Sequence, residues 1–212
     1  MKIILNNLIL DSLNLSSFKD IISNVNDTYH FYRKSGETMY RLLAYLSCYF
    51  NNKLILDIGT CTGTSALALS FNQKNRVISF DTVERQAILI ESKINTINNV
   101  WLKDEGFKVF YLNNIDFIIS KDFMKSFSSF LLVSDLILLD IDHSGIKEKQ
   151  IYDFLVKNNY KGILLLDDII QFDGIINLWK SIDKKKYDLT KYGNFCGTGL
   201  VDFSDDLELF LG

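Results

Sequence analysis

The chain has 212 residues, which suits one domain with a full hydrophobic core, and its 48% hydrophobic and 23% charged residues are an ordinary globular balance. A net charge of -3 gives no reason to expect nucleic-acid binding through a broad basic field, and no apolar run reaches the roughly 18 residues that a membrane span needs. The three cysteines are far apart and lack zinc-ligand spacing, so we expect a cytoplasmic protein in a reducing compartment, with no nucleic-acid or membrane partner.

The first 50 residues are predicted to be helical, because they lack strong β runs. Ser16 or Ser17 can cap a helix that runs to Ile22, and residues 35–50 have the pattern of an amphipathic helix. We expect residues 1–50 to form a helical N-terminal cap on a cofactor-binding core of residues 51–212, within a single domain. Aromatic residues at 29–32 favour an interface there for a homo-oligomer.

From residue 51 onward, short apolar strands alternate with helices. Strands are predicted at 54–58, 76–80, 108–112, 135–139 and 162–166, and helices at 65–71, 84–97, 117–127, 146–157 and 175–182. Segments 187–189 and 198–203 are predicted to form a closing hairpin. This alternation is typical of an α/β fold with helices on both faces of a mostly parallel sheet. We predict a Rossmann-like fold with seven strands.

Acidic residues occur where the predicted strands end. Because right-handed crossovers bring the carboxyl ends of parallel strands to one edge, these side chains should meet there. Buried carboxylates need partners, so their recurrence favours a shared site over packing. The residues are Asp57, Asp81, Asp140, Asp167 and Asp168.

A small turn with glycines at Gly59 and Gly63 separates the first of these strands from a helix. Glycine allows a ligand to approach the backbone closely, and a helix start presents unpaired N–H groups to an anion. The G-x-x-x-G spacing differs from the G-x-G-x-x-G of dinucleotide enzymes, and no G-x-x-x-x-G-K-[ST] run is present. The pattern therefore favours a nucleotide-like cofactor other than a nicotinamide or a nucleoside triphosphate.

Four segments, in order, resemble the class I S-adenosylmethionine-dependent methyltransferases. LDIGTCTGTS at 56–65 resembles their first motif, D/E-h-G-T-x-T-G-Y-S, where h is apolar, and SFD at 79–81 resembles the acidic end of their second strand. DLILLDIDHS at 135–144 and GILLLDDI at 162–169 resemble the later D-h-h-h-h-D-G-D-H-S and G-G-h-h-h-h-D-D-h segments. The resemblance covers about residues 35 to 203 and is greatest to small O-methyltransferases of the catechol and family-24 types.

The resemblance implies S-adenosylmethionine as cofactor. The first turn would lie against its amino-acid and ribose parts, Ser65 would donate to its carboxylate, and Asp81 would accept both ribose hydroxyls. Asn113 and Asn114 follow the third strand, where the family reads the adenine, although they equally suit a turn. Glu37 either reaches the cofactor or caps a helix. The expected cofactor-binding residues are Asp57, Gly59, Thr60, Gly63, Ser65, Asp81, Asn113, Asn114 and Glu37.

The resemblance also implies a metal site and a reaction. Asp140, Asp167 and Asp168 match the ligand positions of the metal-dependent relatives and suit Mg²⁺, with Asp142 as an alternative to Asp140. His143 occupies the place of the catalytic lysine of catechol-type enzymes and would act with Asp140, unless it only orders its loop. We expect methyl transfer to a hydroxyl of a small molecule or sugar. N-methylation, cleavage of the cofactor and non-catalytic cofactor binding stay open.

Overall fold

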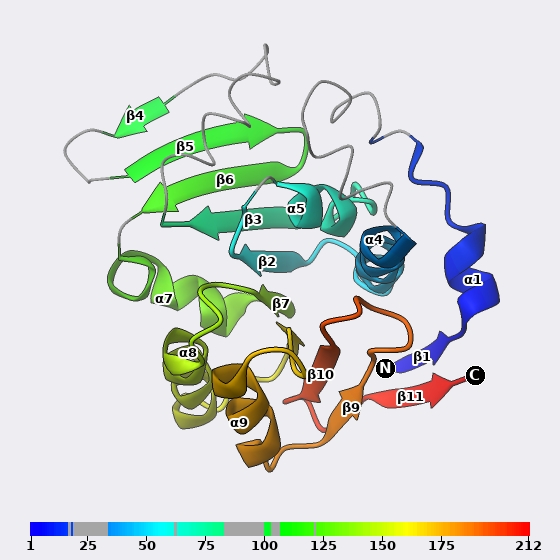
Figure 1. Ribbon diagram of the computed structural model, residues 1–212. Coiled ribbons are helices and arrows are strands. Elements are labelled where there is room, and N and C mark those ends of the chain that lie inside the picture. Colours follow the sequence, from blue (N-terminus) through cyan, green and yellow to red (C-terminus); the bar gives the residue numbers. More distant parts are fainter. Residues whose placement is uncertain (17, 19–33, 62, 83–99, 103–106, 121) are drawn as a thin grey trace.

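The computed structural model describes the chain except residues 17, 19–33, 62, 83–99, 103–106 and 121 (Figure 1). Within the described residues, the main sheet has nine strands in the order β4-β5-β6-β3-β2-β7-β8-β10-β9. Its central strands run parallel: β6 (Ile115–Ser120), β3 (Arg76–Asp81), β2 (Leu54–Ile58), β7 (Leu136–Leu139) and β8 (Ile163–Asp167). Antiparallel pairing adds β5 (Phe107–Leu112) and β4 (Val100–Leu102) at one end, and β10 (Thr198–Asp202) and β9 (Lys186–Asp188) at the other.

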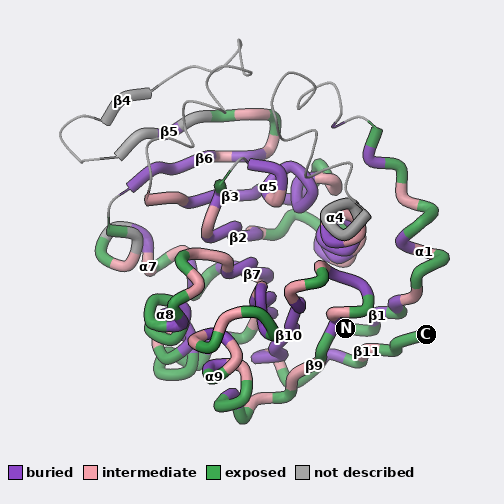
Figure 2. Tube along the Cα trace, viewed as in Figure 1, coloured by how far each residue is buried: buried purple, intermediate pink, exposed green. Residues whose placement is uncertain are grey.

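Helices cover both faces of this sheet. α4 (Lys34–Ser47) and α5 (Thr64–Leu69) pack on one face, and α7 (Phe123–Val133), α8 (Ile146–Lys157) and α9 (Asp173–Ser181) pack on the other. Successive strand residues alternate between the two cores: Leu138 belongs to the α4–α5 side, while Leu139 belongs to the α7–α9 side. The central strands are therefore buried on both faces, as Figure 2 shows, and this explains their almost continuous apolar sequences.

The Rossmann-like α/β fold is confirmed, with more strands than the seven expected. The predicted strands at 54–58, 76–80, 135–139 and 162–166 are β2, β3, β7 and β8, and the closing hairpin is β9 with β10. In Figure 1 the arrows of β2, β3 and β6 point the same way, so their carboxyl ends meet at one edge. The strand order reverses between β2 and β7, and an open sheet of this kind binds ligands at that reversal.

The prediction for residues 108–127 is wrong in part. Segment 108–112 belongs to β5, but 117–127 is not one helix, because β6 occupies Ile115–Ser120 and α7 begins at Phe123. Asn113 has φ 53°, a conformation that asparagine tolerates, and it turns the chain back into a hairpin. The apolar run 117–119 therefore continues a strand that pairs with β3.

The N-terminal region is not purely helical. β1 (Lys2–Leu5) pairs in parallel with β11 (Glu208–Leu211) in a separate two-stranded sheet, and α1 (Asn7–Ser12) follows it. Ile3 and Leu5 are buried in the α4–α5 core, which attaches this small sheet to the domain. The amphipathic helix expected at 35–50 is α4. The helix ending at Ile22, the helix at 84–97 and the aromatic residues 29–32 fall wholly or largely outside the described residues.

The helices that the structure describes are all too short or too polar to span a membrane.

Candidate active site

The turn after β2 is fixed from both sides. The backbone N–H groups of Gly59 and Thr60 donate to the carbonyl oxygen of Phe80, at 2.8 and 3.0 Å, which attaches the turn to β3. Gly59 has φ 113°, and a Cβ there would lie 1.6 Å from the carbonyl oxygen of Asp140. Gly63, at φ 84°, is the residue before α5. The two glycines thus allow the predicted strand–turn–helix and place its backbone against the segment that follows β7.

Asp57 is fully buried beneath this turn. Its Oδ2 accepts hydrogen bonds from the hydroxyls of Ser79, at 2.6 Å, and Ser65, at 3.1 Å, whereas its Oδ1 has no hydrogen-bond partner among the described residues. Burial raises the pKa of Asp57 to about 7, although the two serine hydroxyls oppose that shift. Ser65, expected to bind a cofactor carboxylate, donates its hydroxyl to Asp57 in this structure.

Asp57 should make stability depend on pH. Its pKa in the folded protein, about 7, exceeds the ordinary 3.8, so its contribution to the free energy of unfolding is complete below the lower value and is lost as pH rises through the higher one. Asp57→Asn should therefore reduce the fall in unfolding free energy between about pH 5 and pH 8 by up to about 3 kcal/mol. Urea unfolding at both pH values measures it, and an equal fall in variant and parent would contradict the assignment.

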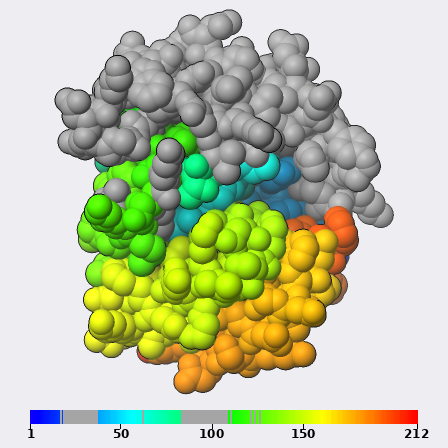
Figure 3. All heavy atoms as spheres, turned by 60° about the vertical axis from the view of Figure 1, so that its left-hand side comes forward, coloured from blue at the N-terminus to red at the C-terminus, as the bar shows by residue number. Residues whose placement is uncertain are grey.

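A pocket of about 400 Å³ opens beside Asp81, the last residue of β3. The Asp81 carboxylate accepts hydrogen bonds from the backbone N–H of Cys61, at 2.9 Å, and of Thr82, at 2.6 Å, so it lies between the turn and the pocket. Figure 3 faces this side of the molecule, where the surface is hollowed between α7 and α8. The pocket is lined by Ile58, Gly59, Phe80, Asp81, Thr82, Asp122, Met124, Ile141, Asp142, Lys147, Gln150 and Ile151.

Asn113 and Asn114 are not at this edge, so their expected contact with the cofactor is wrong. Asn114 accepts from the N–H of Val77 through its carbonyl oxygen and donates through Nδ2 to the carbonyl oxygen of Asn75, at the amino end of β3. Of the β5–β6 pair, β6 is the strand that runs parallel to β3, and Asp122, two residues beyond the end of β6, lines the pocket instead. Glu37 lies in α4, but its side chain is outside the described part of the chain.

A second group of acidic side chains surrounds His143. The Nδ1 atom of His143 lies 2.9 Å from Asp168 Oδ2 and 3.4 Å from Asp140 Oδ1. Ligand atoms of these three residues lie within 4.8 Å of one another, which makes them a candidate cation site in the described part of the chain. Asp167 differs from the expected ligand set, because both its oxygens accept from Nδ2 of Asn194, at 2.7 and 2.9 Å.

Burial governs the electrostatics of this group. Burial raises the pKa of Asp140 to about 6 and also raises the pKa values of Asp167 and Asp168, while the neighbouring His143 opposes the shift at Asp140 and Asp168. The Oδ1 atom of Asp140 is shielded from solvent and lacks a hydrogen-bond partner among the described residues. Buried carboxylates this close together favour a bound proton or cation.

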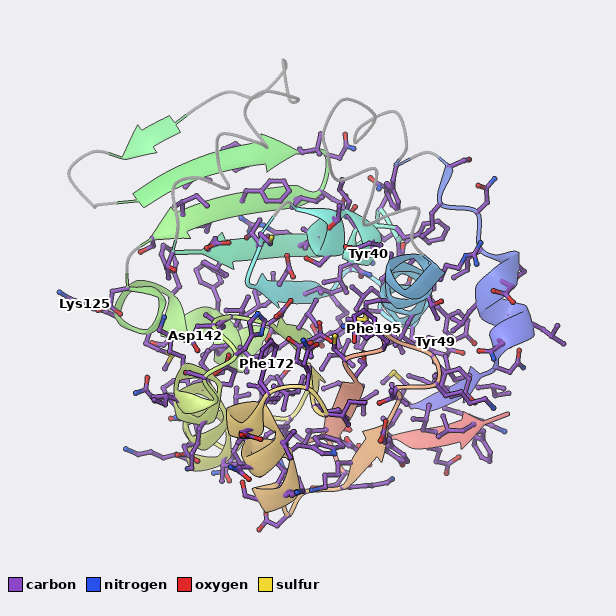
Figure 4. The ribbon with its side chains drawn as sticks, in the orientation of Figure 1. Tyr40, Tyr49, Lys125, Asp142, Phe172 and Phe195 are labelled. Atoms are coloured by element: carbon purple, nitrogen blue, oxygen red, sulfur yellow. The ribbon has the colours of Figure 1, made fainter. Side chains whose placement is uncertain are left out.

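The His143 ring is held in one orientation. The backbone of His143 has φ 59°, and its backbone N–H donates to Glu148 Oε1 at 3.0 Å. The imidazole stacks on the ring of Phe172, with centroids 4.8 Å apart and planes 16° from parallel. Phe172, Asp142 and Phe195 come from three different connections and lie across the middle of the molecule (Figure 4). With Nδ1 beside two carboxylates, Nε2 is the ring atom that remains to meet a substrate.

The loop between β9 and β10 borders the same group through residues 194–197. Its backbone bonds to the segment after β8, because the N–H of Ile170 donates to the carbonyl oxygen of Cys196. Burial and the nearby Asp168 raise the pKa of the Cys196 thiol to about 11, so the thiol stays protonated. Phe195 is 74% exposed and Ile170 is 52% exposed, which leaves apolar side chains on the rim of the site.

Known structures share this architecture. An O-methyltransferase from Bacillus cereus, in complex with S-adenosylhomocysteine, is 14% identical with a TM-score of 0.59, covering 92% of this chain and 95% of that one. A Corynebacterium glutamicum protein has 14% identity, a TM-score of 0.60 and coverages of 92% and 94%. An O-methyltransferase from Streptomyces achromogenes involved in tomaymycin synthesis, in complex with S-adenosylmethionine, has 13% identity, a TM-score of 0.50 and coverages of 77% and 78%.

No protein-family model and no curated protein matches the sequence. The identities to the solved structures are low, so the similarity establishes the fold. The chain shares its Rossmann-like fold with these solved O-methyltransferases, and this is the fold that its motifs predict.

Proposed function

We propose that this protein transfers a methyl group from S-adenosylmethionine to a hydroxyl of a small molecule or sugar. The observation that carries the proposal is the contact between two parts of one sheet edge: the glycine turn after β2 packs on the Asp140 backbone, three residues before the His143 imidazole. A cofactor bound at the glycine turn would then lie next to His143, which could accept a proton. The bacterial O-methyltransferases that share the fold, described with S-adenosylhomocysteine or S-adenosylmethionine, support the same cofactor.

The residues around the turn fit this cofactor. The buried Oδ1 of Asp57, which has no hydrogen-bond partner among the described residues, suits a cationic amino group, and Asp81 suits the ribose hydroxyls. The apolar walls formed by Phe80, Met124 and Ile141 suit the faces of an adenine ring. When bound, the sulfonium supplies an activated methyl carbon, so the protein needs to align the acceptor and remove its proton.

His143 is the group that would take this proton. Asp168 and Asp140 contact Nδ1, which fixes the ring and favours a proton on that atom, leaving Nε2 to accept from the acceptor hydroxyl. Phe172 stacks on one face of the imidazole and so restricts its rotation. The exposed Phe195 and Ile170 would border the acceptor.

A divalent cation fits the same edge. Asp140 and Asp168 would bind it, and Asp140 Oδ1, which accepts no hydrogen bond from the described residues, is a suitable oxygen ligand for Mg²⁺. Asp167 would join them only by giving up one bond from Asn194. When bound, such a cation lowers the pKa of a coordinated hydroxyl. Comparing transfer rates with added Mg²⁺ and with a chelator would show whether the ion takes part.

Transfer of labelled methyl from S-adenosylmethionine to a panel of phenols, alcohols and sugars tests the function. We expect transfer to an oxygen by the parent protein, and S-adenosylhomocysteine binding about 10–100-fold weaker in Asp81→Ala, because two charged hydrogen bonds are lost. Asp153→Asn, on the exposed side of α8, is the control and should bind like the parent. Absence of cofactor binding by the parent would overturn the proposal, and transfer to nitrogen would overturn the acceptor class.

A further inference from the structure

Glu148 is an acidic residue that belongs to neither the cofactor turn nor the aspartate group. It is the third residue of α8, whose N-cap is Gly145. A glutamate at this position ordinarily reaches back to the N-cap N–H and stays in solvent. Glu148 is instead only 1% exposed.

The Glu148 carboxylate accepts hydrogen bonds from the loop that carries His143. These donors precede the N-cap residue, whose N–H an ordinary capping glutamate would bind. One oxygen, Oε1, accepts from two consecutive backbone N–H groups, those of Asp142 at 3.1 Å and His143 at 3.0 Å. These bonds span five and six residues of chain and close the loop between β7 and α8. The other oxygen, Oε2, is buried without a hydrogen-bond partner among the described residues.

The loop is also fixed by close backbone packing against α9. A Cβ at Gly174, in the first turn of α9, would lie 1.9 Å from the carbonyl oxygen of Ser144, so the two backbones are in direct contact. Glu148 from α8 and Gly174 from α9 therefore both contact the loop. His143 lies in this loop with φ 59°, a left-handed conformation that is uncommon for residues other than glycine.

Burying a carboxylate is costly, and two backbone N–H groups offset that cost only in part. Helix capping does not require it, because an exposed residue would serve. We propose that Glu148 is a positioning residue: its carboxylate binds the backbone of the loop and so fixes where the His143 imidazole meets the acceptor. This inference rests on the proposed methyl transfer, and Glu148 is not among the residues that line the pocket beside Asp81.

Three variants of the full chain test this role. Glu148→Gln keeps an acceptor oxygen for the two N–H groups, Glu148→Met has similar length without a strong acceptor, and Glu148→Ala removes both. Asp153→Asn, exposed on the same helix, is the control. The readouts are amide hydrogen exchange at Asp142 and His143 by NMR, affinity for S-adenosylhomocysteine, and kcat and KM for the acceptor found in the methyl-transfer assay.

In the Met and Ala variants we expect exchange at the two amides at least about 10-fold faster, kcat about 10–100-fold lower, and cofactor affinity within about twofold of the parent. Glu148→Gln should restore all three. The inference is overturned if the two amides stay protected in the Met variant, or if the Gln variant loses as much kcat as the Met variant. If the parent protein does not transfer methyl, the proposed function is wrong. The amide exchange rates would still show whether Glu148 binds the loop.

Discussion

Replacing Gly59 by alanine is expected to weaken binding of S-adenosylhomocysteine about 100-fold and to destabilise the fold by about 2–4 kcal/mol. Two effects combine at this position. The φ of 113° is strained for any residue with a Cβ, and the new methyl would lie 1.6 Å from the Asp140 carbonyl oxygen. That oxygen belongs to the backbone, so it cannot turn aside like a flexible side chain. Either the turn or the segment after β7 must move.

Isothermal calorimetry with S-adenosylhomocysteine and thermal unfolding measure the two effects separately. Asn52→Ala is the matched control, because it places alanine at φ 56° in an exposed turn before β2, at the other end of the same strand. This control should lose about 1 kcal/mol of stability and no cofactor affinity. Affinity in Gly59→Ala equal to that of the control would mean that the turn does not contact the cofactor.

The parts of the fold that the sequence predicts are those encoded by local pattern. Four almost purely apolar strands carry an acid at or beside their carboxyl end, and apolar runs of this kind are typical of strands buried on both faces. Asp57, Asp81 and Asp140 therefore lie at the expected edge. The motif spacing then predicts the class of fold, which the solved structures confirm.

What the sequence does not reveal depends on contacts between distant segments. β1 pairs with β11 across some two hundred residues, so its four-residue pattern gives no local sign of a sheet. The run 117–119 is as compatible with a helix as with a strand, and only its pairing with β3 decides.

The same limit applies inside the candidate site. Asp167 matches the ligand pattern, yet Asn194, from a loop far along the chain, occupies its oxygens. Glu148 looks like an exposed helix cap until the loop folds over it. The pocket residue Asp122 would have been found had β6 been recognised as a strand, since it follows the end of that strand.

Replacing His143 by asparagine is expected to lower kcat for methyl transfer about 10²–10⁴-fold, the usual contribution of a positioned general base. Asparagine tests the imidazole more selectively than alanine does, because asparagine tolerates the left-handed backbone that His143 adopts at φ 59°. The loop should therefore persist, with its N–H still bonded to Glu148, and only the imidazole is lost.

Single-turnover rates with saturating S-adenosylmethionine measure this loss, and affinity for S-adenosylhomocysteine should stay within about twofold of the parent, since Asp57 and Asp81 are untouched. Asp168→Asn should also lower kcat, because Asp168 orients the ring through Nδ1, but it should add little to the loss in His143→Asn. Two residues that act as one unit give such non-additive losses. Fully additive losses would show that Asp168 acts independently of the imidazole, as a cation ligand would, and an unchanged kcat in His143→Asn would remove histidine from the reaction.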